Sequence, residues 1–190
     1  ERFVAGEHYF LLERPVPTRD SDKIEVVEMF SYGCPHCYEF DAPVQEWSKQ
    51  QSSDVDFQVF PAVWNKPMEL YARAFYTVEE LNAVEKVHQA LFSAIVIEQK
   101  SIRNESDLAE FFAQHGVDKK VFTEVFNSTA VKTRARYAEE RVRLYKTAGA
   151  PEIIVNGKYR IDRMRAGGLA EMLTVADFLI DKERRLMLKE

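Results

Sequence analysis

The chain has 190 residues, which fits one domain or one domain with a large insertion. Hydrophobic residues make up 46% of it, as in a globular protein with a core, and the net charge of −5 leaves no basic surplus for binding nucleic acid. No apolar stretch approaches the roughly 18 residues of a membrane span, and because the chain begins with Glu1 rather than Met, we expect that an N-terminal segment such as a signal peptide has been removed.

The first part of the chain predicts two strands. Residues 7–12 read as a short strand that is closed off by prolines. Residues 24–30 are apolar apart from two glutamates, which is typical of a buried central strand. Glu28 is one of the two, and a carboxylate in such a strand lies either at a frayed end or is buried for a purpose.

The only two cysteines of the chain follow this strand and enclose a Pro-His pair, as Cys34-Pro35-His36-Cys37. The apolar strand before them and the helical pattern after them place Cys34 at a strand-to-helix turn. There the unpaired N–H groups and the dipole of the helix favour a thiolate over a thiol. Pro35 then takes the first helical position, where its missing N–H costs nothing. We therefore expect Cys34 to be the nucleophile and Cys37 its resolving partner.

Other interpretations of the cysteine pair are weaker. A structural disulfide closing four residues stabilises by only about 2 kcal/mol. A structural zinc site needs four ligands, and there is no second cysteine pair; haem attachment needs a histidine where Tyr38 stands. Redox chemistry without a metal or cofactor is favoured. A reductase or isomerase of the same fold, or a redox-inert metal carrier or holdase, stays open as an alternative.

The chain then alternates between helical and extended patterns. A helix follows the cysteines, residues 55–60 alternate as a strand, and from about residue 66 to residue 146 the pattern is helical. A hairpin is predicted from 153–155 and 159–161, and a final amphipathic helix covers 168–188. The order predicts an α/β fold with an all-helical insertion.

Within the helical part, an apolar stripe from Val84 to Ile95 predicts one helix, and His88 on it reads as a core or surface histidine. Ser106 is the expected N-cap of the next helix, and Gly116 suits its C′ position. A longer helix is expected to end at Gly149.

Two segments resemble the bacterial disulfide-bond oxidase family DsbA of the thioredoxin superfamily. Residues 28–38 are similar to its active-site segment, and residues 149–159 to its cis-proline loop and the hairpin that follows. The resemblance implies a thioredoxin-like fold with an inserted all-helical domain. It places the thioredoxin-like domain at 1–63 and 147–190 and the insertion at 64–146.

The resemblance also implies a function. The protein would be a periplasmic monomer that donates its Cys34–Cys37 disulfide to the thiols of exported, folding proteins through a mixed disulfide at Cys34. A DsbB-like inner-membrane protein that is linked to quinone would reoxidise it.

Roles for two residues near the cysteines follow. A side chain between two sulfurs can hardly avoid Cys34, so the imidazole of His36 is expected to favour the thiolate. The resemblance implies that Glu28 is a buried acid near Cys37 that helps to move its proton.

The same family loop implies that Pro151 is a cis proline, whereas only about 5–6% of X–Pro bonds are cis in folded proteins generally. The backbone beside Ala150 would pair with an extended substrate strand. Ala150 is smaller than the residue usual there, and Gly33 replaces a bulkier one before the first cysteine. Both positions would face the substrate, and the effect of these departures on partner choice and potential stays open.

Overall fold

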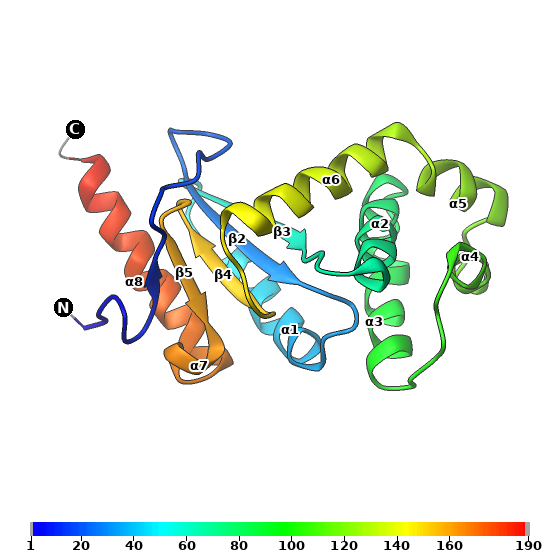
Figure 1. Cartoon of the computed structure of the whole chain (residues 1–190), viewed down its shortest axis with the longest axis horizontal. Helices are drawn as coiled ribbons and strands as arrows, with labels where there is room; N and C mark the ends of the chain where they lie inside the picture. The colour runs from blue at the N-terminus through cyan, green and yellow to red at the C-terminus, as the bar shows by residue number, and fades with distance from the viewer. Residues whose placement is uncertain (1, 189–190) are drawn as a thin grey trace. The chain divides into compact units, whose positions relative to one another are not determined.

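The computed structural model describes residues 2–188 and divides into two compact units (Figure 1). The first unit comprises residues up to 30, 39–60 and those from 142 onward, and the second comprises 31–38 and 61–141. The bounds expected from the sequence, with a thioredoxin-like domain at 1–63 and 147–190 and an insertion at 64–146, remain a prediction.

The first unit is built on a five-stranded sheet in the order β1-β5-β4-β2-β3, which can be followed in Figure 1. Its strands are β1 (Phe10–Leu11), β2 (Ile24–Phe30), β3 (Val55–Pro61), β4 (Glu152–Val155) and β5 (Tyr159–Asp162). All of β2 is buried, as its apolar sequence predicts. β1 is shorter than the predicted strand at 7–12.

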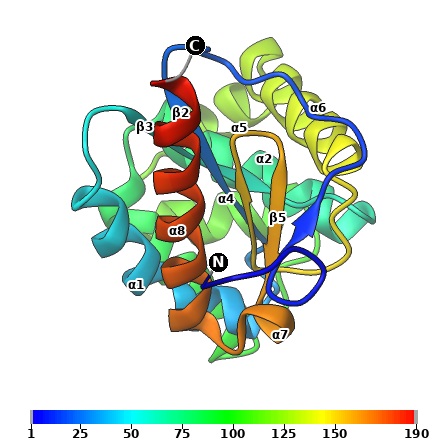
Figure 2. The same ribbon diagram turned by 90° about the vertical axis from the view of Figure 1, so that its left-hand side faces the viewer.

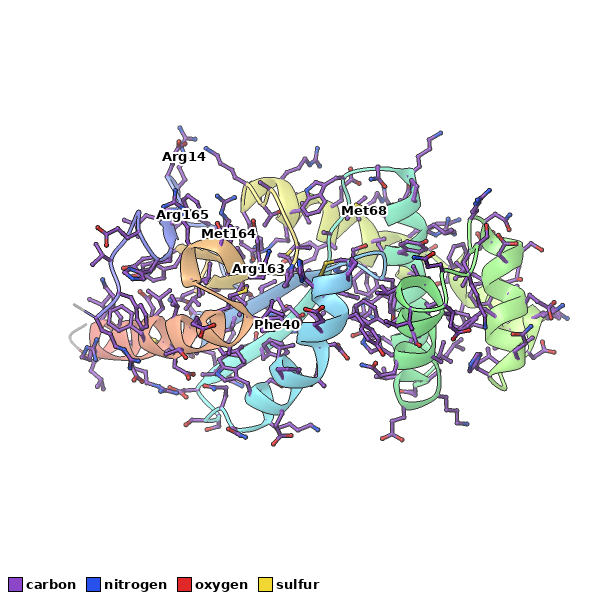
Figure 3. All side chains as sticks on the ribbon, turned by 90° about the horizontal axis from the view of Figure 1, so that it is seen from below. Arg14, Phe40, Met68, Arg163, Met164 and Arg165 are labelled. Carbon is purple, nitrogen blue, oxygen red and sulfur yellow. A yellow bond between two sulfur atoms is a disulfide. The ribbon has the colours of Figure 1, made fainter. Side chains whose placement is uncertain are left out.

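Two helices cover one face of this sheet. Because β2, β4 and β5 pair in antiparallel register, Val26, Val155 and Tyr159 share that face. They form one core cluster with α1 (Pro35–Lys49) and α8 (Leu169–Met187). Figure 2 shows α8 lying along the strands, and Figure 3 labels Phe40, a fully buried residue of α1.

The predicted hairpin is confirmed, with its turn at Asn156 and Gly157. Both residues have positive φ, 50° and 59°, which is the geometry of a tight two-residue hairpin turn. The turn lies against the backbone of Val16, whose N–H donates to the Gly157 carbonyl at 2.8 Å. A Cβ on Gly157 would overlap the carbonyl oxygen of Val16. The short helix α7 (Arg163–Ala166) follows β5 and carries the exposed Met164 (Figure 3).

The second unit is helical. It contains α2 (Lys66–Glu80), a π-helical turn η1 (Val84–His88), α3 (Gln89–Val96), α4 (Glu105–Gln114), α5 (Lys119–Phe126) and most of α6 (Thr129–Leu144). Its core includes the rings of Phe112, Phe122 and Phe126, whose neighbouring centroids lie 4.5 and 5.2 Å apart. No helix within residues 2–188 combines the length and the apolar character that a membrane crossing requires.

Two local predictions in the helical part were wrong. Asn104, not Ser106, caps α4, because its side-chain oxygen accepts from the N–H of Asp107 at 2.9 Å. The stripe from residue 84 to residue 95 is helical as predicted, although its first turn, η1, is π-helical and only α3 is α-helical. Helix α6 ends at Leu144 rather than at the predicted Gly149, because Lys146 has a left-handed backbone conformation with φ 51°. Gly116, with φ 84°, does follow the C-cap of α4 as predicted.

Two glycines with positive φ give a matched test of the hairpin packing. Gly157→Ala is expected to lower the free energy of unfolding by about 2–5 kcal/mol, because it adds a steric overlap to the cost of a left-handed conformation. Gly116→Ala, with nothing within 4 Å of its new Cβ, should lower it by only about 1–2 kcal/mol. Urea denaturation of both variants measures the difference; equal losses would contradict the close approach of Val16.

Candidate active site

The two cysteines form a disulfide at the start of α1, with their Cα atoms 5.2 Å apart. Cys34 has the N-cap position: its carbonyl accepts from the N–H of Tyr38 at 3.1 Å, which is the first hydrogen bond of the helix. Its Sγ accepts from the N–H of Cys37 at 3.1 Å, as the side-chain oxygen of an ordinary N-cap residue does. A free helix N–H and the positive end of the helix dipole are therefore directed at this sulfur.

The two sulfurs differ in access to solvent. Cys34 is partly exposed, whereas Cys37 is fully buried. Pro35 and His36 are both exposed. The first turn of α1 contains no acidic residue that would oppose a negative charge at its N-terminus. Of the two sulfurs, that of Cys34 is therefore the more open to an incoming thiolate.

The contact between Tyr32, which lies just before the cysteines, and His88 was not predicted from the sequence. Tyr32 is fully buried, and its hydroxyl lies 2.7 Å from Nδ1 of His88 in η1. Its ring also packs edge-on against Phe92 at 5.1 Å between centroids. The sequence predicted a core or surface histidine at position 88, and His88 is half-buried. No pattern in the sequence links it to Tyr32.

Glu28 lies in β2 on the sheet face that α1 and α8 cover. It is two residues beyond Val26 on the same strand face, and it pairs with Ile153 of the core cluster. Only 2% of it is exposed. Burial, and secondarily the negative charge of Asp41 on α1, raise the pKa of the Glu28 carboxyl to about 8. The group is therefore a buried acid that can hold or release a proton near neutral pH. Asp41 was not singled out from the sequence.

Ala150 and Pro151 lie in the first unit, immediately before β4. The peptide bond between them is cis, as the resemblance implies. Pro151 is buried and Ala150 is half-buried. The next residue, Glu152, is a buried carboxylate that the sequence analysis did not single out.

The chemistry open to the cysteines is that of a disulfide. They are bonded to each other, and among residues 2–188 no group of at least three His, Cys, Asp or Glu side chains is placed to hold a metal ion.

Comparisons with known proteins agree with this chemistry. A family model described as a DSBA-like thioredoxin domain matches residues 54–179. The thiol:disulfide interchange protein DsbA of Pseudomonas aeruginosa is 41% identical over 182 residues, which cover 96% of this chain and 86% of that protein. The protein of the same name from Burkholderia cepacia is 32% identical, over 93% of this chain and 84% of its own length.

Solved structures give the same result. The crystal structure of Pseudomonas aeruginosa DsbA has a TM-score of 0.94 at 40% identity, covering 98% of this chain and 97% of that one. The oxidoreductase DsbA from Xylella fastidiosa has a TM-score of 0.88 at 32% identity, with 97% and 100% covered. The expected α/β, thioredoxin-like fold with a helical insertion is confirmed. The chain belongs to the DsbA family and is a thiol:disulfide oxidoreductase with Cys34–Cys37 as its active-site disulfide.

Proposed function

We propose that the protein works as an oxidase, donating the Cys34–Cys37 disulfide to substrate thiols. The observation that carries the direction is the helix N–H aimed at the Cys34 sulfur from 3.1 Å. In the reduced protein this N–H and the helix dipole stabilise a negatively charged Cys34 thiolate more than they stabilise the neutral sulfur of the disulfide, because the interaction grows with the charge on the acceptor. A more stable dithiol makes the disulfide a stronger oxidant.

Magnitudes support this direction. A hydrogen bond to a charged group contributes about 1.5–3 kcal/mol, and a helix N-terminus adds roughly 0.3–1 kcal/mol. Since about 1.4 kcal/mol corresponds to one pKa unit and to about 30 mV in a two-electron couple, these contacts raise the potential by roughly 40–90 mV. His36, exposed beside Cys34, adds to this when its imidazole is protonated.

The reaction has two exchange steps. A substrate thiolate attacks Cys34 Sγ and forms a mixed disulfide, while the Cys34–Cys37 bond breaks and its electron pair stays on Cys37. We assign to Glu28 the proton that Cys37 then takes up. A second substrate thiolate attacks the substrate sulfur of the mixed disulfide and releases Cys34 as a thiolate. The substrate loses two electrons, and the enzyme gains them as a dithiol.

The family relationship supports the setting of this reaction. We infer that the substrates are exported, folding proteins with free thiols, that the protein acts in the periplasm as a monomer, and that a DsbB-like inner-membrane protein restores its disulfide. The backbone beside Ala150 and the cis Pro151 is proposed to pair with the extended segment around the substrate thiol.

The first test identifies the nucleophile. Reduced Cys37→Ser protein should form a stable mixed disulfide with a peptide that contains a disulfide, because Cys34 attacks it and no resolving thiol follows. Cys34→Ser, the matched control, should trap little. Thiolate absorbance of the Cys37→Ser variant should show ionisation well below the roughly 8.5 of a free cysteine.

Oxidised wild-type protein should also convert a reduced dithiol peptide to its disulfide, and neither serine variant should. Trapping through Cys37 instead, or an unshifted thiolate titration, would contradict the assignment of Cys34.

A second test ties the dipeptide between the cysteines to the direction of the reaction. Replacing Pro35 by Gly and His36 by Pro removes the imidazole and should weaken the Cys34 thiolate. We expect the pKa of Cys34 to rise and the redox potential to fall together, by about 30 mV for each pKa unit. A potential that falls while the Cys34 pKa stays fixed would show that thiolate energy does not set the direction.

A third test concerns Glu28. Its carboxyl pKa is about 8 in the folded protein, against about 4.5 for an ordinary glutamate, so folding favours the protonated form. This contribution is complete below pH 4.5 and is lost as the pH rises towards 8. Glu28→Gln should therefore raise the free energy of unfolding by about 2–4 kcal/mol at pH 7, and by little at pH 4.

The same variant should slow thiol exchange across pH 5–8 if the carboxyl moves the Cys37 proton. Urea denaturation and stopped-flow exchange measure the two effects separately. A stabilised variant with unchanged exchange rates would leave Glu28 without a part in the reaction.

A further inference from the structure

Glu152 directly follows the cis proline and is only 3% exposed. Its side chain turns back to the loop before the proline: Oε1 accepts from the N–H of Ala148 at 3.3 Å, and the amide of Gly149 also favours the ionised carboxyl. The Glu152 carboxylate, at the start of β4, therefore holds the loop that precedes Ala150 through hydrogen bonds to its backbone.

Arg160 of β5 fastens the same loop at its start. Its Nη1 donates to the carbonyl of Lys146, and its guanidinium lies over the ring of Phe10 at 4.5 Å from the centroid. Its Nε lies 4.0 Å from Oε2 of Glu152, and both of these atoms are buried without a hydrogen-bond partner. The pair is thus an ion pair without a direct hydrogen bond, which makes it sensitive to the ionisation of Glu152.

The other charges around Glu152 are few. The register places Asp162 of β5 and Met29 of β2 on either side of it, so Asp162 is the nearest like charge and β2 offers none directly opposite. Lys146 in the loop pairs with Glu13 at 2.6 Å. Arg160 is therefore the counter-charge of Glu152.

We propose that Glu152, paired with Arg160, is a positioning residue that holds the loop at 146–149 so that the Ala150–Pro151 backbone is presented to a peptide substrate. This rests on the proposed function, in which that backbone pairs with the substrate. Ionised Glu152 holds the amides of the loop, and protonation weakens the hold and the pairing with Arg160.

The pH range follows from the surroundings of the group. Burial raises the pKa of Glu152 to about 7, against the opposing effect of Arg160. Substrate pairing should therefore strengthen as the pH rises from 6 to 8. Glu28, with a pKa of about 8, also changes its ionisation near this range, but in the proposed reaction it acts on Cys37 and therefore affects any thiol substrate alike.

The experiment compares two substrates of the oxidised protein: a dithiol peptide, which offers a backbone, and dithiothreitol, which does not. The ratio of their kcat/KM values should rise with pH through about 7 in the wild type. It should be flat in Glu152→Gln, whose amide does not titrate. In Glu152→Ala the ratio should fall about tenfold through KM for the peptide, the equivalent of about 1.4 kcal/mol for a lost hydrogen bond to a charged group.

Glu183→Gln is the matched control, because Glu183 is another buried carboxylate that binds the same hairpin. It lies on α8 and accepts hydrogen bonds from Asn156, Lys158 and Tyr159 at the turn end of the hairpin, away from the loop at 146–149. It should leave the ratio and its pH dependence unchanged. Thermal unfolding of each variant shows whether it is folded. If Glu152→Ala does not fold, the pH dependence of the ratio in Glu152→Gln tests the inference on its own.

The inference would be overturned if the ratio did not respond to the Glu152 substitutions, either because neither kcat/KM value changes or because both fall by the same factor. A wild-type protein that oxidises neither substrate would instead overturn the proposed function.

Discussion

The hydrogen bond from the Cys37 N–H to the Cys34 sulfur depends on where α1 begins, and much of the fold serves to fix that position. A helix N–H has no partner within its own first turn, so the residue at the N-cap receives it. β2 ends at Phe30, and Cys34 follows a turn of a few residues. Tyr32, buried and paired with His88, keeps that turn in place. The Cys34 sulfur therefore lies next to the helix dipole of α1, which is already oriented before the reaction begins. A preorganised dipole stabilises a developing charge without reorganisation during the reaction.

Glu25, Glu28 and Glu152 are buried glutamates of the sheet with different surroundings. Glu25 accepts hydrogen bonds from the Arg19 N–H, from Gln58 and from Tyr145. For Glu28, burial and the negative charge of Asp41 both raise the pKa, to about 8. For Glu152, burial outweighs the effects of Arg160 and of the loop amides, and the pKa rises to about 7. Both are less stable as carboxylates than in water, so keeping them has a cost in stability. Acids with such pKa values are suited to proton transfer or to a response near neutral pH.

The sequence predicted those parts of the molecule in which local patterns decide the structure. The continuous apolar run at 24–30 predicted a buried central strand, and the turn residues Asn156 and Gly157 predicted the hairpin, because positive φ is needed there. The ends of helices were harder to predict. Ser106 and Asn104 are both good caps, and only the observed bond from the Asp107 N–H distinguishes them.

Contacts between distant residues were not readable from one sequence. Tyr32 and His88 are 56 positions apart, and Glu152 faces Arg160 only because the strands pair in one register. The cysteines were recognised through their spacing and their place between strand and helix, which are local features. The role of His36 came from its position between the two cysteines, and the roles of Glu28, Ala150 and Pro151 came from the family resemblance; all four stay proposals.

The equilibrium of the Cys34–Cys37 pair with glutathione tests the central claim most directly, because the potential measures how far the thiolate stabilises the reduced form. If the helix N–H and its dipole act as we infer, the potential lies above the roughly −180 mV of protein disulfide isomerase. A potential near the roughly −270 mV of thioredoxin would contradict the account, since the disulfide would then be too stable to be donated.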